Sequence, residues 1–161
     1  MPQRNTCLRR TVLLLALAAI PAAHITTGGC AMAQDLTKLL SPDFATADQA
    51  LSEAISRRDA ALVARALDQK FLEMKVKAAR ALVEIGDRGS VPHLIAALEA
   101  NQVAYTGDSE TKVLQKELNE ALTAALAKHT GLQFGAVNPE SAADIGRVLQ
   151  ASKAWAEKNR P

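Results

Sequence analysis

The sequence is poor in the residue types from which most catalytic and metal sites are built. Its 161 residues include only two cysteines, three histidines and one tryptophan. No cysteine or histidine pair has the spacing of a zinc motif, and neither a G-x-S-x-G elbow nor a G-x-x-x-x-G-K-[ST] phosphate loop occurs. We therefore expect no metal, no cofactor and no catalytic residue, which favours a binding protein over an enzyme.

The N-terminus has the organisation of an export signal. Three arginines precede an apolar run at residues 12–20, which is too short to span a bilayer as a mature anchor. Residues 31–33 are Ala-Met-Ala, the small-x-small form that a signal peptidase requires, so the predicted cleavage falls between Ala33 and Gln34. We expect an exported protein of the periplasm or cell envelope, with a signal peptide followed by a linker at residues 34–42.

A different interpretation of the N-terminus places the processing site at Cys30. Gly29 suits the residue before a lipobox cysteine, whereas Thr27 stands where that pattern usually has leucine, and Cys30 lies well past the apolar run. Cleavage there would produce a lipid-anchored envelope assembly factor. The membrane is an expected partner only in that case.

Removal of the signal peptide changes the net charge of the protein. The whole chain has a net charge of +2, but three of its nineteen basic residues and none of its seventeen acidic residues lie within residues 1–33. The mature chain is therefore slightly acidic, whereas binding to nucleic acid or to an anionic membrane needs a clustered excess of Lys and Arg. Both cysteines also precede Gln34, so we expect neither disulfide nor thiol chemistry in the exported form.

Residues 74–98 predict two amphipathic helices joined by a short turn. Gly86 and Gly89 supply a permissive backbone for the turn, and Pro92 suits the first turn of the second helix, where its missing N–H breaks no hydrogen bond. The apolar positions recur at spacings of three and four in both helices. They are Met74, Ala78, Ala81, Leu82, Ile85, Val91, Leu94, Ile95 and Leu98.

A second pair of apolar stripes precedes this one and a third follows it. The first pair turns at residues 57–59, and the third begins after an aperiodic loop at residues 101–108. In the third pair, Gly131 ends a long helix and Ser141 caps the last one. A single helical pair cannot bury its own apolar face, so we expect the three pairs to stack.

The central pair resembles a HEAT repeat of the bacterial type, V-R-x-x-A-A-x-A-L-G-x-I-G-D followed by A-V-P-x-L-I-x-A-L. The chain differs from this consensus at Met74, Lys75 and Val83. The matching residues are Ala78, Ala79, Ala81, Leu82, Ile85, Gly86, Asp87, Val91, Pro92, Leu94, Ile95, Ala97 and Leu98. Residues 126–135, LAKHTGLQFG, with Trp155 after them, look like the closing segment of exported bacterial HEAT-repeat proteins.

The resemblance implies an all-α fold, a short right-handed HEAT-like α-solenoid of about three antiparallel helical pairs at residues 43–161. Phe134 and Trp155 would close its last repeat. It also implies a non-enzymatic adaptor or scaffold that binds another protein. An enzyme-associated accessory role, such as that of the HEAT-like lyases that attach bilin chromophores, is the alternative, but export and the lack of cysteine argue against it.

The predicted binding residues follow from stacking. If the pairs repeat with a constant small rotation, the exposed positions of the second helices line one groove, which selects Arg65, His93 and Arg147. Tyr105 is a further candidate, since it places an aromatic ring in a polar loop. His93 would equally suit an ordinary surface histidine, and Tyr105 a plug over the core.

Overall fold

The computed structural model of the protein describes residues 28–103 and 109–159, and within these residues it contains seven α-helices, two 3-10 helices and no strand. The predicted all-α class is therefore confirmed. The elements are α1 (Gly28–Leu39), α2 (Phe44–Ser56), α3 (Ala60–Arg65), η1 (Ala66–Asp68), α4 (Leu72–Ile85), η2 (Arg88–Ser90), α5 (Val91–Val103), α6 (Ser109–Thr130) and α7 (Ala142–Lys158). None of the described helices is both long enough and apolar enough to cross a membrane.

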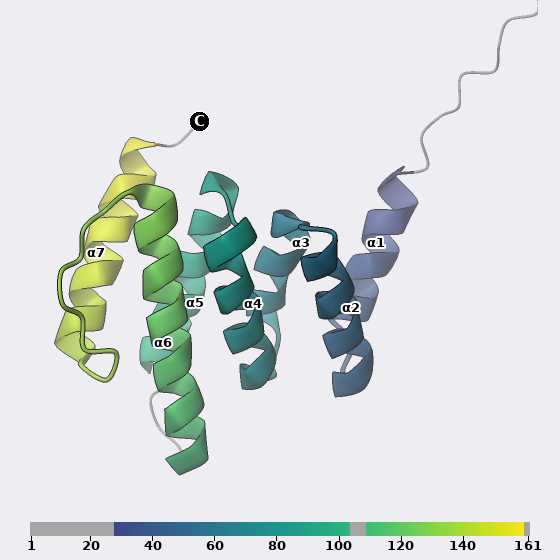
Figure 1. The fold of residues 1–161 in the computed structure, drawn as a ribbon, viewed down its shortest axis with the longest axis horizontal. Helices are drawn as coiled ribbons and strands as arrows, with labels where there is room; N and C mark the ends of the chain where they lie inside the picture. Colours follow the sequence, from purple (N-terminus) through teal and green to yellow (C-terminus); the bar gives the residue numbers. More distant parts are fainter. Residues whose placement is uncertain (1–27, 104–108, 160–161) are drawn as a thin grey trace, which may run out of the picture.

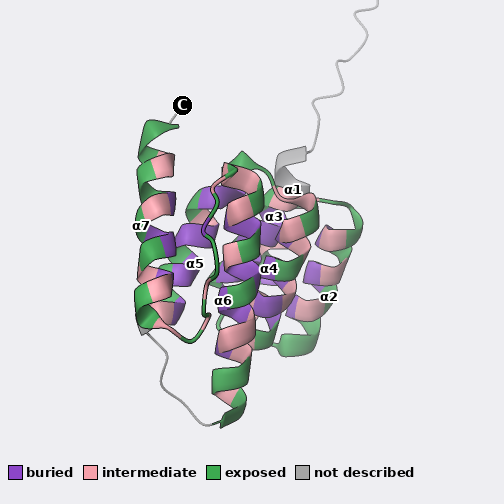
Figure 2. Ribbon diagram, turned by 60° about the vertical axis from the view of Figure 1, so that its left-hand side comes forward, coloured by how far each residue is buried: buried purple, intermediate pink, exposed green. Residues whose placement is uncertain are grey.

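The helices lie in two layers (Figure 1). Helices α2, α4 and α6 pack side by side in one layer, which we call the even layer, while α1, α3, α5 and α7 form the odd layer. Figure 2 shows that buried residues gather on the inner helix faces and exposed residues on the outer ones. The largest fully buried side chains include Leu51, Met74, Leu82, Leu94, Leu98, Leu118 and Leu122.

The two central helices bury the faces that their apolar spacing predicts. All four predicted positions of α5 are buried, and Leu94 and Leu98 are completely inaccessible. In α4, Leu82 and Ala78 are completely inaccessible and Met74 is 1% exposed, whereas Ala81 and Ile85 are partly exposed. The predicted helical register of this pair is therefore confirmed.

A capping box sets the turn between α4 and α5. The Asp87 carboxylate accepts the Ser90 backbone N–H at 3.0 Å, and the Asp87 N–H donates to the Ser90 hydroxyl at 3.5 Å. Helix α5 follows directly, with Pro92 in its first turn. This turn holds η2 at the surface of the odd layer, where Arg88 and Gly89 are exposed.

His129 joins the ends of two even-layer helices. Its Nε2 lies 2.7 Å from the Leu82 carbonyl oxygen, which also accepts the Gly86 N–H at 2.9 Å. A Cβ atom on Gly86 would lie only 2.5 Å from that oxygen and 2.6 Å from His129 Nε2. A side chain at Gly86 would therefore overlap both the Leu82 carbonyl of α4 and the His129 ring of α6, even though its φ of −63° suits any residue.

Helix α1 occupies most of the segment that was expected to be a linker. Residues 34–39 form its C-terminal half, in which Leu39 is completely buried. The Gln69 amide donates to the Leu39 carbonyl, and Asp35 pairs with Arg57 at 2.9 Å. The linker prediction is therefore wrong at residues 34–39, where α1 packs as a helix against the first helical pair.

The third pair does not form an antiparallel hairpin. After α6, residues 131–141 run back along that helix, and Asn119 in its middle donates to the Pro139 carbonyl at 2.8 Å (Figure 1). Helix α7 therefore begins near the end of α5, where Gln102 donates to the Ala142 carbonyl at 3.0 Å. It runs parallel to α6 and antiparallel to α5, so the prediction of three antiparallel pairs is wrong for the third.

Candidate functional site

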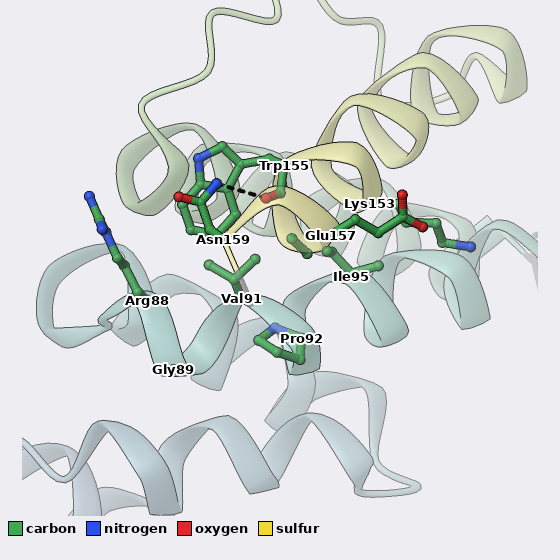
Figure 3. Close-up of a pocket in the computed structure, with 10 residues that line it drawn as sticks. Arg88, Gly89, Val91, Pro92, Ile95, Lys153, Trp155, Glu157 and Asn159 are labelled. Atoms are coloured by element: carbon green, nitrogen blue, oxygen red, sulfur yellow. Dashed lines mark hydrogen bonds between the residues drawn. The ribbon is translucent and has the colours of Figure 1, made fainter. Parts of the chain in front are cut away.

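A groove of about 750 Å³ lies between the start of α5 and the end of α7. We call it the α5–α7 groove. Its apolar lining comes from Val91, Pro92 and Ile95 on α5 and from Trp155 on α7 (Figure 3). Ala156 on α7 completes it. The two helix ends meet because α7 is antiparallel to α5, so the reversal of α7 creates this groove.

Charged side chains flank Trp155 in the α5–α7 groove. The Arg88 guanidinium lies 5.9 Å from the centre of the Trp155 ring, within the range of a cation–π contact. Lys153 pairs with Glu99 on α5 at 2.8 Å. Figure 3 shows Arg88 on one side of Trp155 and the Lys153 and Glu157 side chains on the other.

Asn159 fixes the end of α7 beside this groove. Its backbone N–H and its side-chain amide both donate to the Trp155 carbonyl, at 3.1 and 2.8 Å (Figure 3). The carbonyl oxygens of the last turn of a helix lack partners within the helix. This double contact satisfies one of them and holds the backbone of Trp155 in place.

A second groove, of about 510 Å³, lies between α1, α3 and the start of α5. We call it the α1–α3 groove. Met32 and Leu36 of α1 form one wall, and Ala61 of α3 lies on the other side. Gly89 lines both grooves. The two grooves therefore lie on either side of η2, on the odd layer.

The structure brings together two of the four predicted binding residues. Arg65 of α3 and His93 of α5 line the α1–α3 groove. Arg65 is exposed and pairs with Asp68 at 3.6 Å, while His93 is partly buried. Tyr105 lies outside the described residues.

Arg147 lies apart from Arg65 and His93 and holds the backbone of the segment between α6 and α7. Its guanidinium donates to the Phe134 carbonyl at 2.5 Å and to the Ala136 carbonyl at 3.1 Å, and it pairs with Asp144 at 3.0 Å. These contacts fasten residues 131–141 to α7. The predicted alignment of Arg147 with Arg65 and His93 fails because α7 is reversed relative to α5.

Both candidate processing sites lie in α1. Ala33 and Gln34 are exposed, and the Ala33 carbonyl accepts the Thr37 hydroxyl at 2.8 Å. Cys30 lies in the first turn of the same helix. Cleavage before Gln34 would remove Met32 and Ala33 from the wall of the α1–α3 groove and would leave the Asp35–Arg57 pair intact.

The outer surface of the even layer is bridged by ion pairs between helices. Lys77 of α4 contacts both Asp48 and Ser52 of α2, at 2.5 and 2.8 Å. Two further pairs connect α4 with α6. They are Arg80 with Glu117 at 3.0 Å and Glu84 with Lys128 at 4.0 Å.

The described groups with a shifted pKa belong to the scaffold. Hydrogen bonds from the Thr46 hydroxyl and backbone lower the pKa of Asp43, the N-cap of α2. The Asn138 backbone N–H, and after it Arg147, lower the pKa of Asp144 at the start of α7. Partial burial lowers the pKa of Lys75. None of these three groups lines either groove.

No pattern in the sequence indicates Arg88 as a binding residue, and Trp155 was predicted only to close the last repeat. Their proximity depends on the reversal of α7, which brings the end of that helix to η2, and no periodicity in the sequence signals it. Among the described residues, no group of three or more His, Cys, Asp and Glu side chains is placed to hold a metal ion.

Comparison with known proteins found no family model, no curated protein and no solved structure that matches the chain.

Proposed function

We propose that the protein is an exported, non-enzymatic interaction module of the bacterial cell envelope, which binds a partner protein on its odd layer. One observation carries this proposal: two neighbouring grooves with apolar linings open on the odd layer and share Gly89. Together they cross α1, α3, α5 and α7. Adjacent grooves of this kind suit an extended protein surface better than one compact small molecule.

The HEAT-like solenoid belongs to the same proposal. Its support is that the resembling residues lie on α4, on α5 and at Gly86 and Asp87 between them. Leu82, Leu94 and Leu98 lie in the core, and Asp87 forms a capping box. Two antiparallel pairs, α2 with α3 and α4 with α5, would form the right-handed repeat. Helix α1 would extend it on one side, and the reversed α7 would end it on the other.

Crosslinking from matched positions on the two layers tests the proposed binding face. The protein without its signal has no cysteine, so single cysteines at Ala61→Cys on α3 and Ala45→Cys on α2 can each carry a thiol-linked photocrosslinker. Both alanines are exposed. We expect a discrete protein adduct from envelope extract at position 61 and none at position 45. An adduct at position 45 alone, or equal adducts at both, would place binding elsewhere.

The proposed export can be tested separately, at the processing site. The mature protein should begin at Gln34 and should stay in the aqueous phase of a detergent extraction, because cleavage there leaves no lipid. Intact-mass measurement of the protein from the cell envelope reads the new N-terminus directly. Detection of a diacylated or triacylated Cys30 would instead show that the protein is lipid-anchored. It would rule out cleavage after Ala33.

A further inference from the structure

Arg88 is a groove residue whose charge the described part of the protein does not balance. It is exposed on η2, and no carboxylate among the described residues lies within ion-pairing distance of it. Its guanidinium faces the Trp155 ring instead. A guanidinium in a cation–π contact keeps N–H donors with which it can pair with a carboxylate.

Glu157 presents the opposite charge in the same groove. It is exposed near the end of α7 and has no ion pair with a described residue, whereas Lys153 beside it is paired with Glu99. Between Arg88 and Glu157 the lining is apolar, with Ile95 and Val91 at the base and Trp155 above them (Figure 3). The groove therefore offers an apolar centre with an unbalanced cation and an unbalanced anion at its margins.

We propose that the α5–α7 groove binds an amphipathic helix of the partner protein. The apolar face of that helix packs on Trp155 and Pro92, a carboxylate of the helix pairs with Arg88, and a Lys or Arg pairs with Glu157. This inference rests on the proposed function and specifies the partner of its larger groove. The margin charges of both signs fit a helix with acidic and basic ends and are poorly suited to an anionic lipid headgroup.

The walls of the groove favour a helix over an extended strand. Both walls are helices, and ridges of a third helix can pack between them. The described residues contain no strand, so they offer no sheet edge to which a peptide could add. A groove of about 750 Å³ also has room for several apolar side chains presented at helical spacing.

Trp155 gives the experiment a single-site signal, because it is the only tryptophan in the chain. The probe is a synthetic helical peptide of about 15 residues without Trp or Tyr, with a leucine face, a glutamate at one end and a lysine at the other. We expect saturable binding of one peptide per protein, seen as a shift in Trp155 emission. A peptide of the same composition with its leucines scattered should leave the emission unchanged.

Charge reversal then tests the pairing. Arg88→Glu should weaken binding of the probe by at least about tenfold, and a probe with lysine in place of its glutamate should recover the loss. Lys112→Glu is the matched control, because this exposed lysine lies on α6, outside both grooves. It should bind the original probe as the wild type does.

Three results would overturn the inference. They are an unchanged emission with the original probe, equal weakening by Arg88→Glu and Lys112→Glu, and no recovery with the charge-swapped probe. If any of them occurs while the Ala61→Cys adduct persists, binding on the odd layer stands and only the helix assignment fails. Loss of the adduct with normal probe binding would instead reject the proposed function and keep the groove as a peptide site.

Discussion

Ion pairs bridge the helices of the even layer, whereas the α5–α7 and α1–α3 grooves lie on the odd layer. A smaller groove, of about 400 Å³, lies between α6 and the returning segment, residues 131–141. In the even layer, α2, α4 and α6 run parallel, so a lysine or arginine on one helix reaches a carboxylate on the next. In the odd layer, α3 spans only Ala60–Arg65 and α7 is reversed, so neighbouring helices cover each other unevenly. The difference shows that helix length and direction decide where grooves form on the odd layer.

The largest expected effect tests whether both layers share one core. Leu82 belongs to the even layer and Leu98 to the odd layer, and both are completely buried. Replacing either by alanine should lower the free energy of unfolding by about 2–5 kcal/mol, measured by urea denaturation. Lys77→Ala, at the surface of the even layer, should change it by about 0.5 kcal/mol. A loss at Leu98 as small as that at Lys77 would mean that the core does not extend into the odd layer.

The next effect concerns the closeness of α4 and α6. Gly86→Ala should lower the free energy of unfolding by about 1–3 kcal/mol, because the new methyl group would overlap a backbone carbonyl and the His129 ring. Gly146→Ala on α7 is the control, since its added carbon would meet only the Gln102 amide, at 3.7 Å. That substitution should stabilise the helix by about 0.5–1 kcal/mol. Similar thermal midpoints for the two variants would contradict the steric overlap at Gly86.

Two odd-layer arginines should respond differently. Arg147→Ala removes the donors that hold the Phe134 and Ala136 carbonyls, so it should cost about 1–2 kcal/mol. Arg65→Ala removes only an exposed pair at 3.6 Å and should stay within about 0.5 kcal/mol. Thermal denaturation of both variants measures the difference. Equal midpoints would show that residues 131–141 do not depend on Arg147.

The smallest effect is a pH dependence at the start of α7. The pKa of Asp144 lies below its ordinary value of 3.8, so its contribution to stability is present above that value and is lost as the pH falls through the folded-state pKa. Urea denaturation between about pH 5 and pH 2 should therefore show a smaller loss for Asp144→Asn than for the wild type. Asp43, whose pKa is also lowered, is present in both proteins and contributes to both pH profiles. The difference between the two profiles therefore reports on Asp144. Identical pH profiles would assign no acid sensitivity to Asp144.

Local patterns predicted the helices well and their directions less well. The stripe on α5 and the Ser141 cap of α7 are both present, because each depends on residues three or four apart. The orientation of α7 depends on residues 131–141, which carry no period and run back along α6. The linker prediction failed for a related reason: Leu39 becomes a core residue only when α1 meets α2 and Gln69.

The groove residues also fall into two groups, those that the repeat spacing indicates and those that only the tertiary structure brings together. Arg65 and His93 were selected by the repeat spacing, and they line one groove because α3 and α5 are consecutive second helices of hairpin pairs. The contact of Arg88 with Trp155 joins residues that are far apart in the chain, and it exists only because the returning segment turns α7 around.

The sequence by itself determined that this protein is helical, where its central pair turns and which faces of that pair are buried. These properties are encoded within a few residues by apolar spacing, glycine and capping side chains. Only the tertiary structure decided that the even layer is bridged by ion pairs, that α1 packs on the first pair and that the odd layer carries grooves. Each of these depends on contacts between helices distant in sequence, whose free energy is set by packing geometry that a local pattern does not contain.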